Sequence, residues 1–273
     1  AKIVAAVKAG TLSEAALNKA VIRILNIVFR AADEAAAPAP ELDLKGDHTI
    51  AAELAKECAV LLQNRGVLPL KKGSKVVYIG GFAKTPRYQG AGSSHIEPTK
   101  LECGLDALRA EGVNVIGFAP GFRRSGGESR RLREQACKLS ESADAVLMWL
   151  GLDEGSEAEG VDRQHMRIAE NQIRLLREVS EVNPNVVVIL SCGSPVEADW
   201  DCRAKALLHG YLSGQAGAKA IARLVSGKAC PSGKLAETMP RRLSDTPCYI
   251  RYPGTERTSE YLSLIHISEP TRP

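Results

Sequence analysis

Short apolar runs alternate with longer amphipathic stretches along most of the chain. The short runs are rich in β-branched and other aliphatic residues, which is typical of strands that are buried on both faces. They lie at 76–80, 113–118, 145–150, 186–191 and 206–211. The longer stretches, in which apolar residues recur at helical spacing, lie at 102–111, 128–140, 165–182 and 216–226. This order predicts an α/β fold with a mainly parallel sheet and helices on both faces.

The first part of the sequence contains the clearest amphipathic helix. Apolar residues recur at helical spacing over residues 11–32, and Thr11 with Glu14 fits a capping box at the start. Two prolines then exclude a continued helix, so residues 33–46 are expected to form a linker. The spacing of apolar residues over 50–61 predicts a further helix.

Residues that could bind a ligand or catalyse a reaction are expected just after the predicted strands, because ligands of parallel α/β sheets bind at the carboxyl ends of the strands. Three such segments are polar: residues 80–97, the residues after Leu150, and residues 191–197. The second of them, residues 151–163, carries three glutamates and two aspartates on a loop broken by glycines. These acids are interpreted either as a solvated surface loop or as a site that brings a carboxylate close to a ligand.

The first polar segment suggests a competing function. It contains Gly80-Gly81 and, further on, Gly90 and Gly92, whose backbone N–H groups could hold a phosphate. No Gly-x-Gly-x-x-Gly opens a helix directly after the strand, and there is no Gly-Lys-Ser/Thr. The open interpretations are a non-catalytic flavodoxin-like module that binds a nucleotide or sugar phosphate, and glycines that serve only a tight turn.

Four separate segments occur in the order typical of one known family. They are 52–70 (AELAKECAVLLQNRGVLPL), 83–95 (AKTPRYQGAGSSH), 157–163 (EAEGVDR) and 232–240 (SGKLAETMP). They resemble the second, α/β-sandwich domain of glycoside hydrolase family 3, especially that of bacterial β-glucosidases. Residues 1–32 resemble the end of the (β/α)8 barrel that precedes this domain. The resemblance implies an α/β-sandwich domain over residues 47–261 that is incomplete at its C-terminal end.

The resemblance also implies a retaining, exo-acting β-glycosidase that removes terminal β-linked sugars. Such enzymes use a carboxylate nucleophile and, about 5 Å away, a carboxylic acid that acts first as acid and then as base. In this family the nucleophile is an aspartate of the barrel, which this sequence lacks, and the acid/base is a glutamate on a loop of the second domain. Matching the Glu-Gly-x-Asp-Arg pattern places the acid/base at Glu159, with Glu157 as runner-up and Glu154 third.

The glycine-rich segment is expected to contact the substrate. Ser93 matches a position whose hydroxyl reaches the sugar in the family. Gln89 and Arg87 are further candidates, and shaping of the loop is their alternative role. Asp162 and Arg163 are expected to fix the acidic loop through an ion pair or through bonds to the backbone.

The composition limits the kinds of partner that this chain is expected to bind. The net charge of +4 is scattered and only 4% of the residues are aromatic, so no nucleic acid is expected as a partner. No run approaches the roughly 20 apolar residues of a membrane span. His95 and His165 have no partner at ligand spacing and no Cys-x-x-Cys pair occurs, so neither a metal nor a cofactor is expected. The expected partners are a β-linked oligosaccharide or glycoside and the barrel domain of the same chain.

Both ends of the sequence differ from the family. The sequence begins without Met, so the compartment stays open, although seven scattered cysteines favour the cytoplasm. Residues 262–273 resemble a translated sequencing adaptor and are expected to be a non-native tail, with a genuine short tail as the alternative. The chain is therefore expected to be a fragment that is inactive by itself.

Overall fold

The computed structural model of the protein describes residues 2–39, 41–93, 95–251, 254–255 and 257–258. The chain divides into two compact units, residues 1–43 and residues 44–273. None of the helices in the described part of the chain is both long and apolar enough to cross a membrane. The expected adaptor-derived tail, residues 262–273, lies outside the described residues.

The N-terminal unit contains α1 (Lys2–Lys8) and α2 (Glu14–Ala36). Ser13 is the N-cap of α2, because its backbone is extended and its side-chain oxygen accepts a hydrogen bond from the Ala16 N–H at 3.2 Å. Thr11 instead donates its hydroxyl to the carbonyl of Ala6. The predicted capping box of Thr11 and Glu14 is therefore wrong, and α2 also continues for several residues into the predicted linker.

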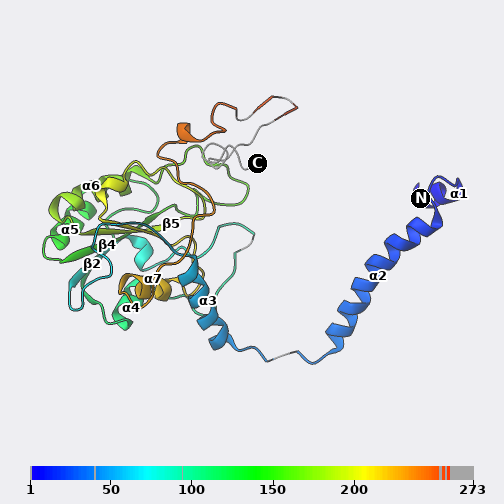
Figure 1. The fold of residues 1–273 in the computed structure, drawn as a ribbon, viewed down its shortest axis with the longest axis horizontal. Helices are drawn as coiled ribbons and strands as arrows, with labels where there is room; N and C mark the ends of the chain where they lie inside the picture. Colours follow the sequence, from blue (N-terminus) through cyan, green and yellow to red (C-terminus); the bar gives the residue numbers. More distant parts are fainter. Residues whose placement is uncertain (1, 40, 94, 252–253, 256, 259–273) are drawn as a thin grey trace, which may run out of the picture. The chain divides into compact units, whose positions relative to one another are not determined.

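The second unit is built around a six-stranded sheet in the order β1-β6-β5-β4-β2-β3 (Figure 1). The strands are β1 (Val60–Asn64), β2 (Lys75–Ile79), β3 (Asn114–Ala119), β4 (Ala145–Gly151), β5 (Val186–Ser191) and β6 (Ala206–His209). All neighbouring pairs are parallel except β1 with β6. Every predicted strand is present, so the mainly parallel α/β sheet is confirmed.

Helices cover both faces of this sheet. They are α3 (Leu44–Cys58), α4 (Gly104–Ala110), α5 (Arg130–Ser140), α6 (Glu170–Val182) and α7 (Gly217–Val225). The α5 and α6 helices pack together on one face, and α7 contacts both α3 and α4 on the other (Figure 1). The two central strands β4 and β5 are buried along their whole length, as their continuous apolar runs predict.

The edge strand β1 corrects one predicted helix. The apolar spacing up to Leu61 suggested a single helix, but α3 ends at Cys58 and Leu61 pairs with Leu208 of β6. A period of three to four residues fits a helix, yet backbone pairing with an available strand outweighs it over so short a run. The strand could not be separated from the helix by its pattern alone.

Gln172 of α6 completes the backbone hydrogen bonds at the carboxyl end of β4. Its buried side chain accepts a hydrogen bond from the Gly151 N–H (2.9 Å) and donates one to the Gly151 carbonyl (2.8 Å). Gln172→Ala leaves both backbone groups without these bonds in the core, so we expect a loss of about 2 to 4 kcal/mol in the free energy of unfolding. Urea unfolding followed by circular dichroism measures this loss. Gln164→Ala is the control because Gln164 is exposed, and equal losses in the two variants would contradict the expectation.

Candidate active site

Three loops meet at the carboxyl edge of the sheet. We name them the glycine-rich loop (80–97, after β2), the acid loop (152–163, after β4) and the β5 loop (192–197). A parallel bridge joins Ala91 of the glycine-rich loop to Ala158 of the acid loop, and the Glu159 N–H donates to the Ala91 carbonyl at 3.0 Å. The expectation that these polar segments share one edge is confirmed.

Glu159 is exposed at this edge, and its carboxylate lies against Ser93. Its Oε2 atom accepts hydrogen bonds from the Ser93 backbone N–H at 2.6 Å and from the Ser93 hydroxyl. The hydroxyl bond first, and then the backbone bond, hold the pKa of Glu159 below the ordinary carboxyl value of 4.5. Ser93 therefore stabilises Glu159 in its ionised form.

Gly92 lets the glycine-rich loop pass close to Glu159. Its φ is +122°, and a Cβ atom there would lie 2.7 Å from both Cβ and Oε2 of Glu159. We expect Gly92→Ala to displace the carboxylate from Ser93, so that the pKa of Glu159 rises toward 4.5 in a carbon-13 NMR titration of the chain. Gly90→Ala is the matched control, since a methyl group there meets nothing within 4 Å. Identical Glu159 titrations in the Gly92→Ala variant and the unsubstituted chain would refute this expectation.

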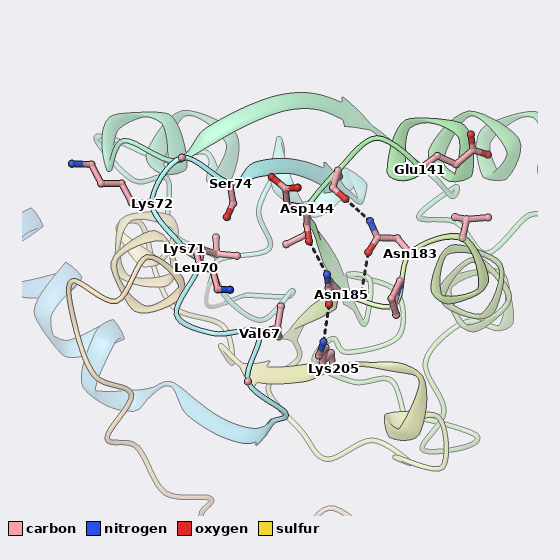
Figure 2. A pocket seen from close by; sticks show the side chains of 16 residues that line it. Val67, Leu70, Lys71, Lys72, Ser74, Glu141, Asp144, Asn183, Asn185 and Lys205 are labelled. Atoms are coloured by element: carbon pink, nitrogen blue, oxygen red, sulfur yellow. Dashed lines mark hydrogen bonds between the residues drawn. The ribbon is translucent and has the colours of Figure 1, made fainter.

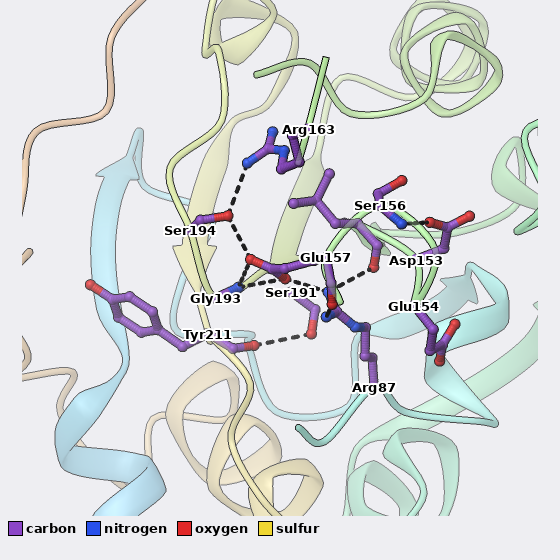
Figure 3. Close-up of polar contacts among 12 residues, drawn as sticks. Arg87, Asp153, Glu154, Ser156, Glu157, Arg163, Ser191, Gly193, Ser194 and Tyr211 are labelled. Carbon is purple, nitrogen blue, oxygen red and sulfur yellow. Dashed lines mark hydrogen bonds and ion pairs between the residues drawn. The ribbon is translucent and has the colours of Figure 1, made fainter. Parts of the chain in front are cut away.

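Glu157 lies deeper and has a denser set of contacts. Its carboxylate forms an ion pair with Arg87 and accepts hydrogen bonds from the Gly193 N–H (3.0 Å) and the Ser194 hydroxyl (2.6 Å) (Figure 3). Burial raises the pKa of Glu157, but the bonds from Ser194, Gly193 and Arg87, with the charge of Arg87, outweigh it and lower the pKa below 4.5. This geometry favours the ionised form of Glu157, which cannot donate a proton.

Two of the residues expected to contact the substrate, Arg87 and Gln89, bond instead to other parts of the protein. The side chain of Arg87 is only 1% exposed, and its guanidinium also donates to the carbonyls of Glu157 (2.9 Å) and Leu152 (3.3 Å). The Gln89 side-chain oxygen accepts a hydrogen bond from the Ile96 N–H within the same loop. Arg87 thus faces the protein interior and Gln89 closes its own loop, so both placements fit the loop-shaping alternative.

Two further residues of the acid loop are tied to their surroundings. Glu154 forms an ion pair with Arg124 at the surface. Arg163 donates to the Ser194 hydroxyl (2.9 Å) and to the Pro195 carbonyl (3.0 Å), so the expected bond from this arginine to the backbone is confirmed. The sequence did not single out Ser194; its only signal is its place in the third polar segment after a buried strand.

The alternative chemistries find little support among the described residues. No group of three or more His, Cys, Asp or Glu side chains within them could hold a metal ion. A short 3-10 helix, Gly81–Ala83, follows β2 in place of the helix N-terminus that cradles phosphate in nucleotide-binding folds. The nucleotide-binding alternative is therefore not favoured.

A cavity of about 830 Å³ opens at the opposite, amino edge of the sheet (Figure 2). Four of its polar side chains, those of Asp144, Asn183, Asn185 and Lys205, bond to one another or to the main chain. Lys205 donates to the Asn185 side chain at 2.8 Å, and Asn185 donates to the Asp144 carbonyl at 2.9 Å. These bonds join the starts of neighbouring strands and therefore have a structural role. The candidate catalytic residues are those at the carboxyl edge.

Comparison with known proteins decides the family. Residues 59–266 match the family model described as the glycosyl hydrolase family 3 C-terminal domain. The chain belongs to glycoside hydrolase family 3. The family predicted from the sequence motifs is thus confirmed.

Three named relatives match almost the whole chain. Thermostable beta-glucosidase B of Acetivibrio thermocellus is 44% identical over 265 residues, which cover 95% of this chain and 35% of that protein. Exo-alpha-(1->6)-L-arabinopyranosidase of Bifidobacterium longum is 38% identical over 272 residues, which cover 95% of this chain and 36% of that protein. The crystal structure of the Bifidobacterium adolescentis GH3 beta-glucosidase matches with a TM-score of 0.87 at 41% identity, over 93% of this chain and 38% of that one. The chain spans little more than a third of the length of these relatives.

Proposed function

We propose that this chain supplies the acid/base half of the active site of a retaining, exo-acting β-glycosidase. Glu159 is the general acid and base, and the nucleophile is an aspartate on a (β/α)8 barrel of the parent protein. The observation that supports this assignment is the exposed Glu159 carboxylate, which Ser93 holds at the carboxyl edge of the sheet. The neighbouring Glu157 is enclosed by an ion pair, which leaves Glu159 as the accessible member of the two.

The two steps of the reaction ask for opposite protonation states of one carboxyl group. In the first step the protonated acid gives its proton to the leaving oxygen while the nucleophile attacks the anomeric carbon, and in the second the carboxylate takes a proton from water. The bonds from Ser93 favour the carboxylate, which the second step uses. Docking against an acidic barrel mouth raises the pKa of Glu159 through desolvation and like charge, so that it holds a proton for the first step.

The residues near Glu159 keep separate roles in this proposal. Ser93 lies at the exposed edge with its hydroxyl next to the acid, so it remains the proposed substrate contact, whereas Gln89 shapes the same loop through its bond from the Ile96 N–H. Arg87 shapes the loop and does not contact sugar, because its side chain is enclosed. The substrate is a terminal β-linked sugar of an oligosaccharide or glycoside.

The N-terminal unit supports a barrel as the partner domain. No residue of α2 is buried, although Val21, Ile24 and Val28 of this helix are apolar and share one face at helical spacing. An exposed apolar stripe of this kind is stabilised when it packs on another body. We therefore propose that α1 and α2 complete the barrel, and that the chain alone does not hydrolyse glycosides.

Fusing the chain to the barrel of the A. thermocellus enzyme tests this proposal, since that relative is 44% identical to it. Aryl β-glucosides and aryl α-L-arabinopyranosides are the substrates to compare, because one relative is a beta-glucosidase and the other an arabinopyranosidase. We expect the fusion to release sugar with retained anomeric configuration in proton NMR spectra taken early in the reaction, and the chain alone to release none. Inversion, or no hydrolysis of either sugar by a folded fusion, would contradict the proposal.

A further inference from the structure

We infer that Arg87 and Glu157 form a buried clasp that positions Glu159, so that Glu157 is a positioning residue and not a second acid. The consequence for catalysis rests on the proposed function, whereas the clasp itself is a property of this chain. It joins all three loops of the carboxyl edge: Arg87 comes from the glycine-rich loop, Glu157 from the acid loop, and Ser194 from the β5 loop.

The guanidinium of Arg87 holds the acid loop at more than one point. It donates to the Leu152 carbonyl where the loop begins (3.3 Å), and to the backbone carbonyl of Glu157 (2.9 Å) as well as to its carboxylate. Planar guanidinium groups suit such multiple bonds better than a lysine does. Arg87 therefore fixes the main chain of the acid loop and not only one side chain.

The carboxylate of Glu157 extends the clasp to the third loop. It accepts the Gly193 N–H and the Ser194 hydroxyl, and Ser194 in turn accepts a bond from Arg163 at the far end of the acid loop. Gly193 leaves room for this approach, since a Cβ atom there would lie 3.2 Å from the Glu157 carboxylate. The beginning, middle and end of the acid loop are thus tied to one connected group of side chains (Figure 3).

Glu159 depends on this group because few bonds of its own hold it. Between Glu157 and Glu159 lies only Ala158, which bridges to Ala91, and the Glu159 carboxylate is bound only through Ser93 among the described contacts. A loop free to shift at Glu157 would carry Glu159 away from Ser93. The buried pair thus sets the place of the exposed acid two residues further on.

Hydrogen exchange of the Glu159 amide tests the clasp in the chain itself. In the double variant Arg87→Met/Glu157→Gln both charges of the pair are removed together, so neither partner leaves the other as an unpaired buried charge. We expect the Glu159 amide, which bonds to the Ala91 carbonyl, to exchange at least about tenfold faster, while the Met148 amide in β4 stays within about twofold. The pKa of Glu159 rises toward 4.5 in the same variant.

The matched control is Glu154→Gln, which removes the ion pair of the same loop with Arg124 but keeps the hydrogen bond of Arg124 to the Thr85 carbonyl in the glycine-rich loop. It is expected to leave the exchange of the Glu159 amide unchanged. Unchanged exchange at Glu159 in the clasp variant would overturn the inference, and so would equal acceleration at Glu159 and Met148, which would mark a merely structural role. If the double variant does not fold, the same hydrogen-exchange measurements are made on the single variant Glu157→Gln, which keeps the shape of the side chain. The same outcomes then support or overturn the inference.

Kinetics of the fusion enzyme separate the clasp from the acid assignment. We expect Glu157→Gln to lower kcat about tenfold on glycosides with poor leaving groups, with a smaller loss on activated aryl glycosides and little change in KM. Equal losses in kcat on both kinds of substrate would contradict the positioning role of Glu157. If Glu159→Gln shows no dependence on the leaving group, the proposed function fails, while the exchange result still decides the clasp.

Discussion

Glu159→Gln in the fusion enzyme is expected to slow the cleavage of poor leaving groups by roughly a hundredfold to ten-thousandfold, the usual contribution of a general acid or base. The amide has the shape of the acid but carries no transferable proton, so the departing oxygen must leave as an anion. Activated aryl glycosides, whose leaving groups need no proton, lose far less in the first step. Rates for a series of aryl glycosides, plotted against the pKa of the leaving group, measure the difference.

Azide provides a second measurement on the same variant. It attacks the glycosyl-enzyme without help from a base, so added azide is expected to restore turnover of activated substrates and to give a glycosyl azide with the configuration of the substrate. Glu154→Gln, which lies in the same loop in an exposed ion pair with Arg124, is the control and should show no azide effect. A steep leaving-group dependence with Glu154→Gln and none with Glu159→Gln would reject the assignment of the acid.

The sheet was predictable because its signal is local. The parallel strands are short apolar runs, of which the central β4 and β5 are buried on both faces, and the polar segments after the strands had to meet at one edge whatever the details of the loops. The edge strand β1 was missed because Leu61 also fits the helical spacing of the preceding residues. The N-cap of α2 was misplaced for a similar reason, since Thr11 and Ser13 are both good caps and only the backbone decides between them.

The choice between two glutamates needed contacts that no local pattern contains. Glu157 and Glu159 lie on one loop and are chemically alike. What distinguishes them is Arg87, which lies 70 residues before Glu157 and draws it into the interior, and Ser93, which keeps Glu159 at the surface. The motif predicts the acid at Glu159, but the reason why its neighbour is enclosed is visible only in three dimensions.

Arg87→Met is expected to lower the free energy of unfolding by roughly 3 kcal/mol near neutral pH, which is the low end for breaking a buried ion pair. The loss arises because Glu157 keeps its charge in a largely enclosed site while the guanidinium that compensated it is gone. Urea unfolding of the chain measures it. Glu154→Gln is the matched control, because it breaks a half-exposed ion pair of the same loop, worth about 1 kcal/mol or less, and keeps the other contacts of Arg124.

The pH dependence of this loss identifies Glu157 as its source. In the unsubstituted chain the pKa of Glu157 lies below its ordinary value of 4.5, so the pair stabilises the fold above that pH and loses its effect as the pH falls through the folded-state pKa. In the Arg87→Met variant burial still raises the pKa of Glu157, while fewer contacts remain to lower it. Glu157 therefore takes up a proton more readily, and this protonation removes the unpaired charge. The difference between the two proteins should therefore shrink below about pH 4.5. A loss that is the same in acid and at neutral pH would mean that Arg87 stabilises the fold by packing and backbone bonds alone, without its charge.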